Sequence, residues 1–483
     1  MEICWNAGTD EKATKLLEEC GWTVCTGPCD VPVQVTSEGS GFLVKGPGSA
    51  SQSCADIAAA MAYINEDILQ AEAAQPSGGA RPDLDTFEGC MVGIGIGDMV
   101  GLGVEGFPMP LCTQYTDQIR PEGGLTQTQG PWETGARMQA QGIDRKEDRG
   151  PLVLSELFES TSDEFVPATL DDKGSCRFPY GQISDDTQCS RELSDSIIAA
   201  GRFSVEAFTD KLTHLHSTIG VIGQGPTSRA TLDKLADGAS WFEGSDEKPD
   251  ALTNGSIMRV GPVGLLAWAD PTSQSAWANG VLSSHVTHQA SLCKEGCSAL
   301  GVAVAAAVAA KVAGADPVSA VLDALGETCP YTDYRGMLAS MLQAGPELQL
   351  AVDAMHAAVP QNELFKTQGH DGGGRYKHGE ITMFPPHSAG FAIYGFLRTP
   401  DDFWESIFAC IQVGGDTDTV AAMCGALAGA YAGYEKIASA RPDAGHVLSA
   451  IQDSADPGTA DVPALRKLAK GLYDVAVGPA PKL

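Results

Sequence analysis

Two aspartates follow a pair of glycines in the segment QVGGDTDTVAAMCGALAGAY, residues 412–431. In an extended or turn conformation, residues at positions i and i+2 project to the same side, so Asp416 and Asp418 can face one point. Their like charges repel unless a cation lies between them. The alternative is helix capping, in which Asp or Thr accepts hydrogen bonds from free amides of the first turn. Capping explains one aspartate and one threonine, but not both Asp-Thr pairs behind Gly414 and Gly415.

A second set of oxygen ligands precedes another predicted helix. The segment ISDDTQCSREL, residues 183–193, offers the hydroxyl of Ser184 and the carboxylates of Asp185 and Asp186. Capping is again the alternative. The two motifs together supply four carboxylates and two hydroxyls, a donor set that suits Mg²⁺, Mn²⁺ or Ca²⁺ rather than zinc. Two such ions about 3.5–4 Å apart can polarise a substrate oxygen and activate a water.

The third element is a glycine-rich helix, EGCMVGIGIGDMVGLGVEGFP, residues 88–108. Glycine at this density permits close helix packing or a close backbone approach, at a cost in helix propensity. A dinucleotide-binding fingerprint is rejected, because neither a preceding strand nor a βαβ unit is predicted here. Asp98 is predicted to be a buried structural acid. Glu105 follows the helix and is predicted to face a site.

Apolar periodicity predicts that the elements carrying these residues are helices. From Phe87 onward, helices are predicted at about 87–102, 187–201, 203–218, 297–313, 316–326, 335–358, 388–398, 402–413, 419–433, 443–453 and 462–475. The interval 106–180 is acidic and rich in Pro and Gly, so a surface insertion is expected at about 110–175. Residues 361–386 are expected to form another irregular loop. The sequence therefore predicts one mostly α-helical domain at 86–478, with functional residues on interhelical loops.

Residues 1–85 have a different composition and are expected to form a small extension of unknown role. An amphipathic segment at 10–20 precedes a β-branched, glycine-rich stretch and a second helix-like stretch. The linker QPSGGARPD then marks a boundary near residue 85. Cys20, Cys25 and Cys29 cluster here, but zinc is the weaker interpretation because no clear fourth ligand follows at suitable spacing.

Composition excludes several classes of function. Among 483 residues, 31 are basic and 62 acidic, which gives a formal net charge of −31. This charge argues against binding to nucleic acid or an anionic membrane, and it requires a phosphorylated ligand to be held by backbone amides or a metal. The 14 cysteines lack framework spacing, and the N-terminal residues lack a signal pattern, so a reducing, cytoplasmic location is expected. The apolar run at 298–315 contains Lys311 and is predicted to be a buried helix.

At this point the motifs resemble those of a known family. GCMVGIGIGDMVGLGVEG, SDDTQ, NGSIMRVGPVGLL, SHVTHQAS and VGGDTDTVAAMCGALAGAYAG occur in the order seen in ADP-ribosylglycohydrolases. The resemblance spans about residues 87–475 and implies a compact, orthogonal, all-α domain with two bound metal ions. The segment FAIYGFLRTPDDFWESIFACIQVGGDTDT is most similar to the branch that contains the ADP-ribosylserine hydrolases.

The resemblance also implies site residues. Two Mg²⁺ ions, for which Mn²⁺ is a possible substitute, are expected to bind Ser184, Asp185, Asp186, Asp416, Asp418 and Thr419. The expected catalytic residues are Glu105, Asp185 and Asp186. The residues expected to bind the nucleotide are Gly223, Gly225, Asn254, Gly255, Ser256 and His288.

Each nucleotide-binding assignment has a structural alternative. Gly223 and Gly225 could form a turn before a helix, Asn254 and Gly255 form an ordinary turn dipeptide, and His288 could be a hydrogen-bonded interior histidine. Where serine-specific members have a Ser-Tyr pair, this chain has Ala251 and Leu252. The long interval between Glu105 and Ser184 is a second departure, so substrate specificity does not transfer from the family.

The resemblance implies an Mg²⁺-dependent hydrolase that removes ADP-ribose from serine or arginine side chains, or from related conjugates, by cleaving the bond at the anomeric carbon. A monomer acting on ADP-ribose or an ADP-ribosylated protein is expected. One alternative is a catalytically weak or inactive ADP-ribose-binding or structural relative. Another is a metal-dependent hydrolase of a different nucleotide.

Overall fold

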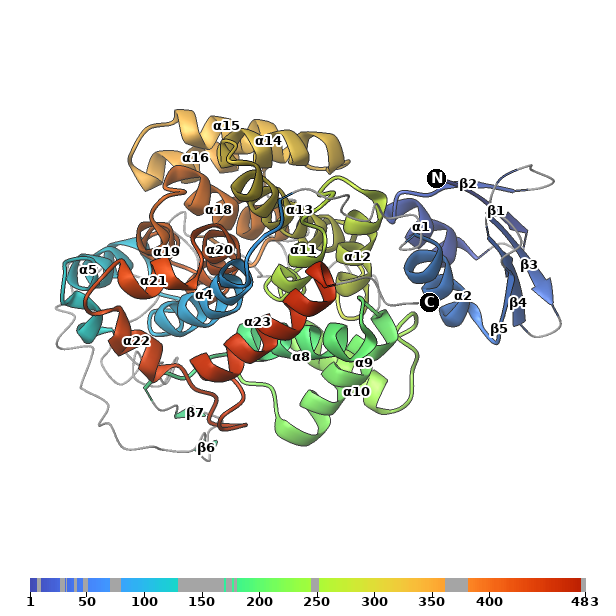
Figure 1. The fold of residues 1–483 in the computed structure, drawn as a ribbon, viewed down its shortest axis with the longest axis horizontal. Helices are drawn as coiled ribbons and strands as arrows, with labels where there is room; N and C mark the ends of the chain where they lie inside the picture. The colour runs from blue at the N-terminus through green and yellow to red at the C-terminus, as the bar shows by residue number, and fades with distance from the viewer. Residues whose placement is uncertain are drawn as a thin grey trace.

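The computed structural model describes residues 1–6, 10–26, 31, 33–38, 41–46, 51–69, 80–128, 169–170, 176–177, 180–244, 252–360 and 381–478. A large helical body and a small N-terminal module of strands and helices are visible in Figure 1. The expected all-α architecture with a small extension is confirmed.

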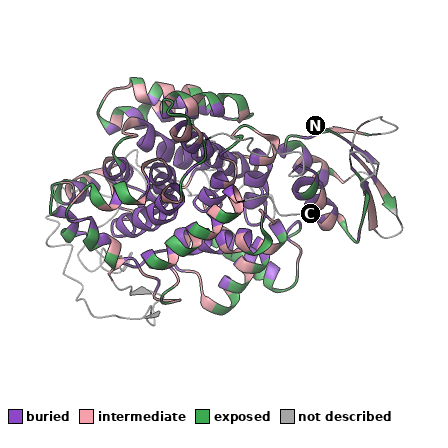
Figure 2. Cartoon of the chain, in the orientation of Figure 1, coloured by how far each residue is buried: buried purple, intermediate pink, exposed green. Residues whose placement is uncertain are grey.

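The helical body contains the predicted functional residues. Its α-helices are α4 (Leu84–Leu102), α5 (Met109–Ile119), α8 (Asp185–Ala200), α9 (Val205–His214), α10 (Pro226–Ala236), α11 (Gly261–Leu266), α12 (Gln274–His285), α13 (Ser291–Ala313), α14 (Pro317–Thr328), α15 (Tyr334–Gln343), α16 (Leu348–Ala358), α18 (Pro385–Arg398), α19 (Phe403–Gln412), α20 (Thr417–Ala432), α21 (Tyr434–Ser439), α22 (Ala444–Ala450) and α23 (Val462–Val477). Short 3₁₀ and π segments are η2 (Gly124–Gln127) and η3 (Leu215–Ile219), and β6 (Thr169–Leu170) pairs with β7 (Cys176–Arg177). Helices α4 and α20 pack against each other at the centre and are almost entirely buried (Figure 2).

Glycines allow the backbones of α4 and α20 to touch. A Cβ atom added to Gly93 would lie 2.2 Å from the carbonyl oxygen of Gly425, and one added to Gly425 would lie 2.1 Å from the carbonyl oxygen of Gly93. The same crowding occurs one turn along, where a Cβ on Gly97 would lie 2.1 Å from the carbonyl oxygen of Ala421. Any larger residue must therefore push the helices apart. The glycine-rich segment serves close helix packing, as its composition predicts.

We expect Gly97→Ala to destabilise the protein by about 2 kcal/mol or more, because its methyl group would meet rigid backbone. The matched control is Gly95→Ala on the same helix, whose Cβ would meet the flexible tip of Leu465 at 3.1 Å. That variant should change stability by no more than ~1 kcal/mol, since better helix propensity offsets the contact. Urea denaturation measures both values. Equal stability of the two variants would contradict this account of the helix contact.

The N-terminal module is a five-stranded sheet with its own helices. Its elements are β1 (Glu2–Asn6), α1 (Glu11–Glu19), β2 (Thr23–Cys25), β3 (Val33–Glu38), β4 (Gly41–Lys45), β5 (Ser51–Cys54), α2 (Ile57–Ala62) and the π segment η1 (Tyr63–Ile68). The strand order is β2-β1-β3-β4-β5, with β1 parallel to both neighbours and the later pairs antiparallel. Helices α1 and α2 lie between this sheet and the helical body (Figure 1).

A buried ion pair fixes the module to the body. Glu19 at the end of α1 accepts a bond from the ammonium of Lys294 at 2.5 Å and one from the hydroxyl of Ser291 at 2.6 Å. The indole of Trp277 donates to the backbone oxygen of Glu19 at 2.8 Å. A second contact joins Glu66 of η1 to the amide of Val205 at 2.6 Å. These bonds reach α12, α13 and α9, so the module is part of the folded unit.

Glu19→Ala should cost about 3–5 kcal/mol of stability, because it leaves the Lys294 ammonium buried without a counter-charge. Replacing both partners, as Glu19→Leu with Lys294→Met, should cost much less, since no charge is then stranded. The control is Asp67→Ala, which removes the more exposed ion pair between Asp67 and Arg202. That change should cost at most ~1 kcal/mol. Chemical denaturation of the full chain provides the comparison, and a double variant as unstable as Glu19→Ala would refute it.

Several element predictions need correction. Residues 335–358 form two helices, α15 and α16, because the chain turns at Gly345, whose φ is +112°, and continues into Pro346. Helix α5 lies in the interval expected to be a surface insertion, yet it buries Leu111 and Tyr115 and packs on α19. The remainder of that interval lies largely outside the described residues, as do positions 361–380.

Helices α5, α10, α11, α12 and α21 are absent from the predicted set. Helix α12, QSAWANGVLSSH, is buried along most of its length, so its sequence does not show a clear alternation of apolar and polar faces. Among the described residues, one helix, α13, has the length and composition of a membrane span, and 78% of its most apolar window is buried inside the protein. The prediction of a buried helix there is confirmed. Cys20 is buried and Cys25 half-buried, whereas Cys29 lies outside the described residues.

Candidate active site

A backbone bridge brings the loop after α4 to the loop before α20. The amide of Gly106 donates to the carbonyl of Gly415 at 2.7 Å, and the amide of Gly415 donates to the carbonyl of Phe107 at 2.9 Å. Gly414 and Gly415 have φ of +77° and +87°, a conformation that side-chain-bearing residues rarely adopt. The glycine pair is thus required by the turn, and the turn places Glu105 next to Asp416.

Two adjoining groups of carboxylates result. Oxygens of Asp98, Asp186 and Asp418 lie within 4.8 Å of one another, and so do oxygens of Glu105, Asp416 and Asp418. Asp418 belongs to both groups. The side chains come from the C-terminal part of α4 and the loop after it, and from the starts of α8 and α20, so three segments distant in sequence converge here. The predicted pairing of the two aspartate motifs is therefore present in the structure.

Asp98 orients the start of α8. Its two oxygens accept bonds from the amide of Ser184 at 2.9 and 3.0 Å, and one of them also accepts from the amide and hydroxyl of Thr187 at 3.0 and 2.5 Å. It is fully buried. The prediction of a buried structural acid is confirmed, and the geometry adds its task, which is to hold the turn that carries Asp185 and Asp186.

Capping accounts for only part of the two motifs. Ser184 is the N-cap of α8, and its hydroxyl accepts from the amide of Asp186 at 3.3 Å. Asp416 occupies the N-cap position of α20, but its side chain makes no capping hydrogen bond. Within the first turn of α20, Asp418 accepts a hydrogen bond from the adjacent amide of Thr419 at 2.8 Å. Helix capping therefore does not explain why both Asp416 and Asp418 are present.

The donor chemistry fits a hard cation. Asp186 Oδ2 accepts from the hydroxyls of Ser184, at 2.9 Å, and Thr419, at 3.4 Å, whereas the fully buried Asp186 Oδ1 has no hydrogen-bond partner. A buried carboxylate oxygen without a partner is costly, and a divalent cation would satisfy it. All candidate metal-ligand atoms in the two groups are carboxylate oxygens, which favours Mg²⁺ or Mn²⁺ over zinc.

The electrostatics of the cluster lead to the same conclusion. Burial, and then the negative charges of Asp98, Glu105 and Asp416, raise the pKa of Asp185 to about 8. Burial followed by neighbouring carboxylates also raises the pKa values of Asp186 and Asp418 well above their usual range. Full ionisation is thus unfavourable without a compensating positive charge.

The glycine-rich loop at 223–225 lies partly against this cluster. The amide of Asp185 donates to the carbonyl of Ile222 at 2.8 Å, and a Cβ on Gly223 would lie 3.3 Å from Asp185 Oδ1. Gly223 has a φ of +79°. Gly225 precedes Pro226 at the start of α10, and a Cβ there would meet nothing within 4 Å. Gly223 therefore adjoins the carboxylates, while Gly225 has the position of a turn residue.

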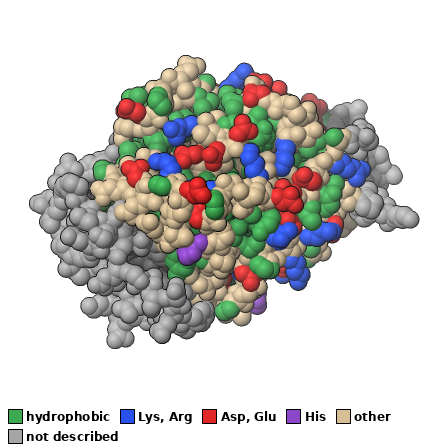
Figure 3. All heavy atoms as spheres, turned by 60° about the vertical axis from the view of Figure 1, so that its left-hand side comes forward, with side chains coloured by type: hydrophobic (Ala, Val, Ile, Leu, Met, Phe, Trp, Pro, Cys, Tyr) green, Lys and Arg blue, Asp and Glu red, His purple; other side chains and the backbone are tan. Residues whose placement is uncertain are grey.

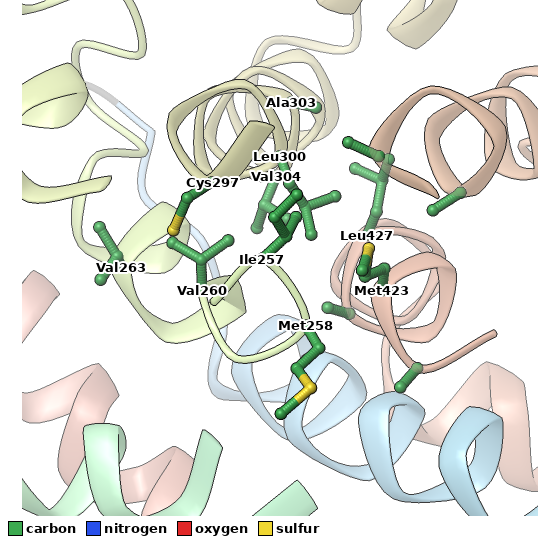
Figure 4. Packing of buried hydrophobic residues seen from close by; sticks show 14 of the residues in the cluster. Ile257, Met258, Val260, Val263, Cys297, Leu300, Ala303, Val304, Met423 and Leu427 are labelled. Atoms are coloured by element: carbon green, nitrogen blue, oxygen red, sulfur yellow. The ribbon is translucent and has the colours of Figure 1, made fainter. Parts of the chain in front are cut away.

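The segment after Leu252 contacts the carboxylate cluster on the side of Asp416. The amide nitrogen of Asn254 donates to Asp416 Oδ2 at 2.5 Å and to the hydroxyl of Ser388 at 3.0 Å. Ser256 is fully buried, and its hydroxyl is bonded to that of Ser284 at 2.8 Å. Figure 4 shows the following residues, Ile257, Met258 and Val260, packed in the core beside α13 and α20. The core thereby anchors the segment.

His288 lies against this segment and is buried, and both of its ring nitrogens are hydrogen-bonded. Its Nε2 is 2.9 Å from the hydroxyl of Thr253, and its Nδ1 is 2.8 Å from the hydroxyl of Thr287. A Cβ on Gly255 would lie 3.1 Å from the His288 ring. Burial, helped by the charge of Arg259, lowers the pKa of His288 to about 3, so the ring is neutral.

Comparison with known proteins agrees with this arrangement. The sequence profile of a family described as ADP-ribosylglycohydrolase matches residues 80–480. The chain belongs to the ADP-ribosylglycohydrolase family. The resemblance inferred from the motifs is thereby confirmed, and membership identifies a glycohydrolase enzyme whose family activity is hydrolysis of ADP-ribosyl conjugates.

Individual relatives of this ADP-ribosylglycohydrolase are distant. It is 24% identical to the ADP-ribosylhydrolase ARH3 of Gallus gallus over 381 residues, 74% of this chain and 88% of the relative. It is 25% identical to the ADP-ribosylarginine hydrolase Tri1 of Serratia proteamaculans over 278 residues, 55% of this chain and 63% of the relative. A solved structure titled ADP-ribosylglycohydrolase-related protein complex covers 82% of this chain and 99% of its own, at 20% identity and a TM-score of 0.50. That last likeness concerns the fold alone.

The structure also reveals contacts that sequence reasoning did not predict. The family resemblance implies a nucleotide contact for Asn254, whereas its side-chain bond to Asp416 joins two segments far apart in the chain. The Glu105 loop is fixed by Gly415, again across a long sequence separation. The sequence contains a signal for the turn at Gly415, because adjacent glycines directly before an acidic motif indicate a constrained turn.

Metal-free protein should lose stability as the pH rises. Because the pKa of Asp185 in the fold is about 8 and an unfolded aspartate has a pKa of about 3.9, the native state binds more protons than the unfolded state between these values. Melting temperature measured in EDTA should therefore fall from pH 5 to pH 8. Asp185→Asn should weaken this dependence, and excess Mg²⁺ should reduce it in the wild type. An identical pH profile for both proteins in EDTA would contradict the assignment.

Proposed function

We propose that this protein is an Mg²⁺-dependent hydrolase that releases ADP-ribose from modified serine or arginine side chains, or from related conjugates, by cleaving the bond at the anomeric carbon of the distal ribose. The observation that carries this proposal is the pair of carboxylate groups sharing Asp418: one contains Glu105, and the other contains Asp186, whose buried Oδ1 has no hydrogen-bond partner. The named activities of the ARH3 and Tri1 relatives support the substrate class.

Six side chains would hold the cations. These are the residues of the two motifs, Ser184, Asp185, Asp186, Asp416, Asp418 and Thr419. Bound Mg²⁺ or Mn²⁺, in two neighbouring positions, would supply Lewis acidity and lower the pKa of a coordinated water. The protein residues would fix the orientation of the distal ribose relative to Glu105.

Glu105 is the proposed acid–base residue. It is half-buried at the edge of the cluster, and one of its oxygens lies within 4.8 Å of oxygens of Asp416 and Asp418. From there its carboxylate would take a proton from the attacking water, or its acid form would give one to the leaving group. The short bridge through Gly106 limits how far this side chain can move.

The diphosphate would bind to backbone amides. The loop around Gly223 lies beside Asp185, and the Asn254 segment lies beside Asp416, so both flank the carboxylates. Neutral amides suit an anion in a chain with a net charge of −31. On the face shown in Figure 3, acidic and basic side chains are interspersed, so local backbone donors are a better explanation than a basic surface field.

Two further functions make different predictions. An inactive ADP-ribose-binding relative would bind ADP-ribose and release none from conjugates. A hydrolase of another nucleotide would act on a phosphoester without producing ADP-ribose. The gathering of Asp186, Asp416 and Asp418 with Glu105 in two adjoining groups favours a hydrolase over a binding protein. The monomeric state, the cytoplasmic location and the absence of nucleic-acid or membrane partners remain predictions.

A substrate panel tests the proposal. The full chain is incubated with ADP-ribosylserine peptide, ADP-ribosylarginine peptide and O-acetyl-ADP-ribose, with Mg²⁺ or with EDTA, and released ADP-ribose is measured. We expect Mg²⁺-dependent release from at least one substrate. Asp416→Asn should reduce the rate by more than the ~10–100-fold typical of losing an outer-shell partner. Asp402→Asn, which alters an exposed cap of α19, is the matched control and should retain activity.

Mg²⁺-independent release, or full activity of Asp416→Asn, would refute the cation assignment. Tight ADP-ribose binding without release from any conjugate would instead support the binding protein. Release of a nucleotide product other than ADP-ribose would support the third candidate.

A further inference from the structure

The side-chain amide of Asn254 is committed to the carboxylate cluster. An amide nitrogen has two hydrogens to donate. Asp416 Oδ2 accepts one, at 2.5 Å, and the hydroxyl oxygen of Ser388 accepts the other, at 3.0 Å. Ser388 donates its own proton to the carbonyl of Thr382 at 2.7 Å, so its oxygen is available as an acceptor. Both donors of Asn254 are therefore used inside the protein, and Asp416 is held by a neutral partner.

A closed hydrogen-bond network holds the backbone on both sides of Asn254. The guanidinium of Arg259 donates to the carbonyl of Gly255 at 3.4 Å and to the hydroxyl of Thr287 at 2.8 Å. That hydroxyl is paired with Nδ1 of His288, and Nε2 of His288 is paired with the hydroxyl of Thr253. The network thus connects Gly255, the residue after Asn254, to Thr253, the residue before it.

The surroundings make this network rigid. Arg259 is 1% exposed, as is His288, and the guanidinium lies 5.0 Å from the ring centre of Phe208. The guanidinium also donates to the carbonyl of Ser283 at 2.8 Å, which ties it to α12. Ile257 packs in the core beside Leu300 and Val304 of α13 (Figure 4), and Met258 is also buried. Alternative placements of Asn254 would break buried bonds or open a cavity.

We propose that Asn254 is a positioning residue for the Asp416 carboxylate, and that the network of Arg259, Thr287, His288 and Thr253 acts on the cation site through Asn254. The inference rests on the proposed function, because it assumes that Asp416 binds a cation. The hydrogen bond from the Asn254 amide to Oδ2 restrains the rotation of the carboxylate that would hold the cation. An amide partner restrains the ligand without adding charge, as outer-shell partners of metal ligands commonly do.

The roles of Asn254 and His288 are separable from nucleotide binding. A residue that contacts the diphosphate affects binding of ADP-ribose and the KM of the conjugate. A residue that orients Asp416 affects Mg²⁺ affinity, while KM at saturating Mg²⁺ changes little. His288 is enclosed by two threonine hydroxyls, so its effect should pass through the loop.

The first experiment compares Asn254→Ala with the wild type and with Asn279→Ala, a control that removes another buried asparagine, on α12. Isothermal titration calorimetry of metal-stripped full chain with Mg²⁺ should show 10–100-fold weaker binding for Asn254→Ala. The control should bind Mg²⁺ as the wild type does. KM at saturating Mg²⁺ should change less than about 3-fold if the residue acts on the metal site alone. Unchanged Mg²⁺ affinity with a raised KM would overturn the proposal.

The second experiment tests the path through the network. His288→Leu should weaken Mg²⁺ binding, and His288→Gln, which keeps a donor and an acceptor, should restore part of the affinity. The double variant Asn254→Ala with His288→Leu should bind Mg²⁺ like Asn254→Ala alone. An additional loss in the double variant would overturn the network part of the proposal. Thr287→Val supplies the same comparison if His288→Leu does not fold.

The two proposals fail in different ways. If the wild type binds Mg²⁺ but releases ADP-ribose from no conjugate, the proposed function fails while calorimetry still decides the role of Asn254. If the wild type is an active, Mg²⁺-dependent hydrolase and Asn254→Ala binds Mg²⁺ normally, only the positioning role fails.

Discussion

The backbone contact between α4 and α20 determines where the chemistry can occur. At Gly93 and Gly425, each added Cβ would overlap the partner's carbonyl oxygen, so the two helices run as close as their main chains allow. Asp98 lies within one helix and Asp418 in the first turn of the other. Their carboxylates can belong to one group only because no side chains separate the backbones at this contact. The plain alanine and glycine sequence of α20 is thus the support for its acidic first turn.

Concentrating carboxylates at this contact has an electrostatic cost, and the surrounding structure limits it. Asp98 is stabilised by the amides and hydroxyl of the α8 start, and Asp416 by the amide of Asn254. Asp186 retains one buried oxygen without a partner. The fold therefore supplies hydrogen-bond donors to Asp98 and Asp416 and leaves Oδ1 of Asp186 without one. That oxygen is well placed to receive a cation. This division is a physical reason to regard the cluster as functional.

The N-terminal module adds a feature outside the family match, which begins at residue 80. Its attachment through Glu19 and Lys294 is buried, and Lys294 lies next to Cys293, whose thiol contacts the carbonyl of Thr253 at 3.3 Å. The module consequently supports the beginning of α13, close to the loop that holds Asn254. Removal of the module would expose this part of the helical body rather than separate an independent domain.

The sequence by itself determined the helical class, the two acidic motifs, the structural role of Asp98 and the family. These are encoded locally, by apolar periodicity, by runs of glycine and by short motifs whose residue types suit one chemistry. Only the tertiary structure decided that Asn254 contacts Asp416, that Gly415 fixes the Glu105 loop, and that α5 belongs to the core. Each depends on segments brought together by packing, and a local pattern carries no information about its distant partner. The break between α15 and α16 was visible at Gly345 and Pro346, but continuous apolar periodicity on either side concealed it.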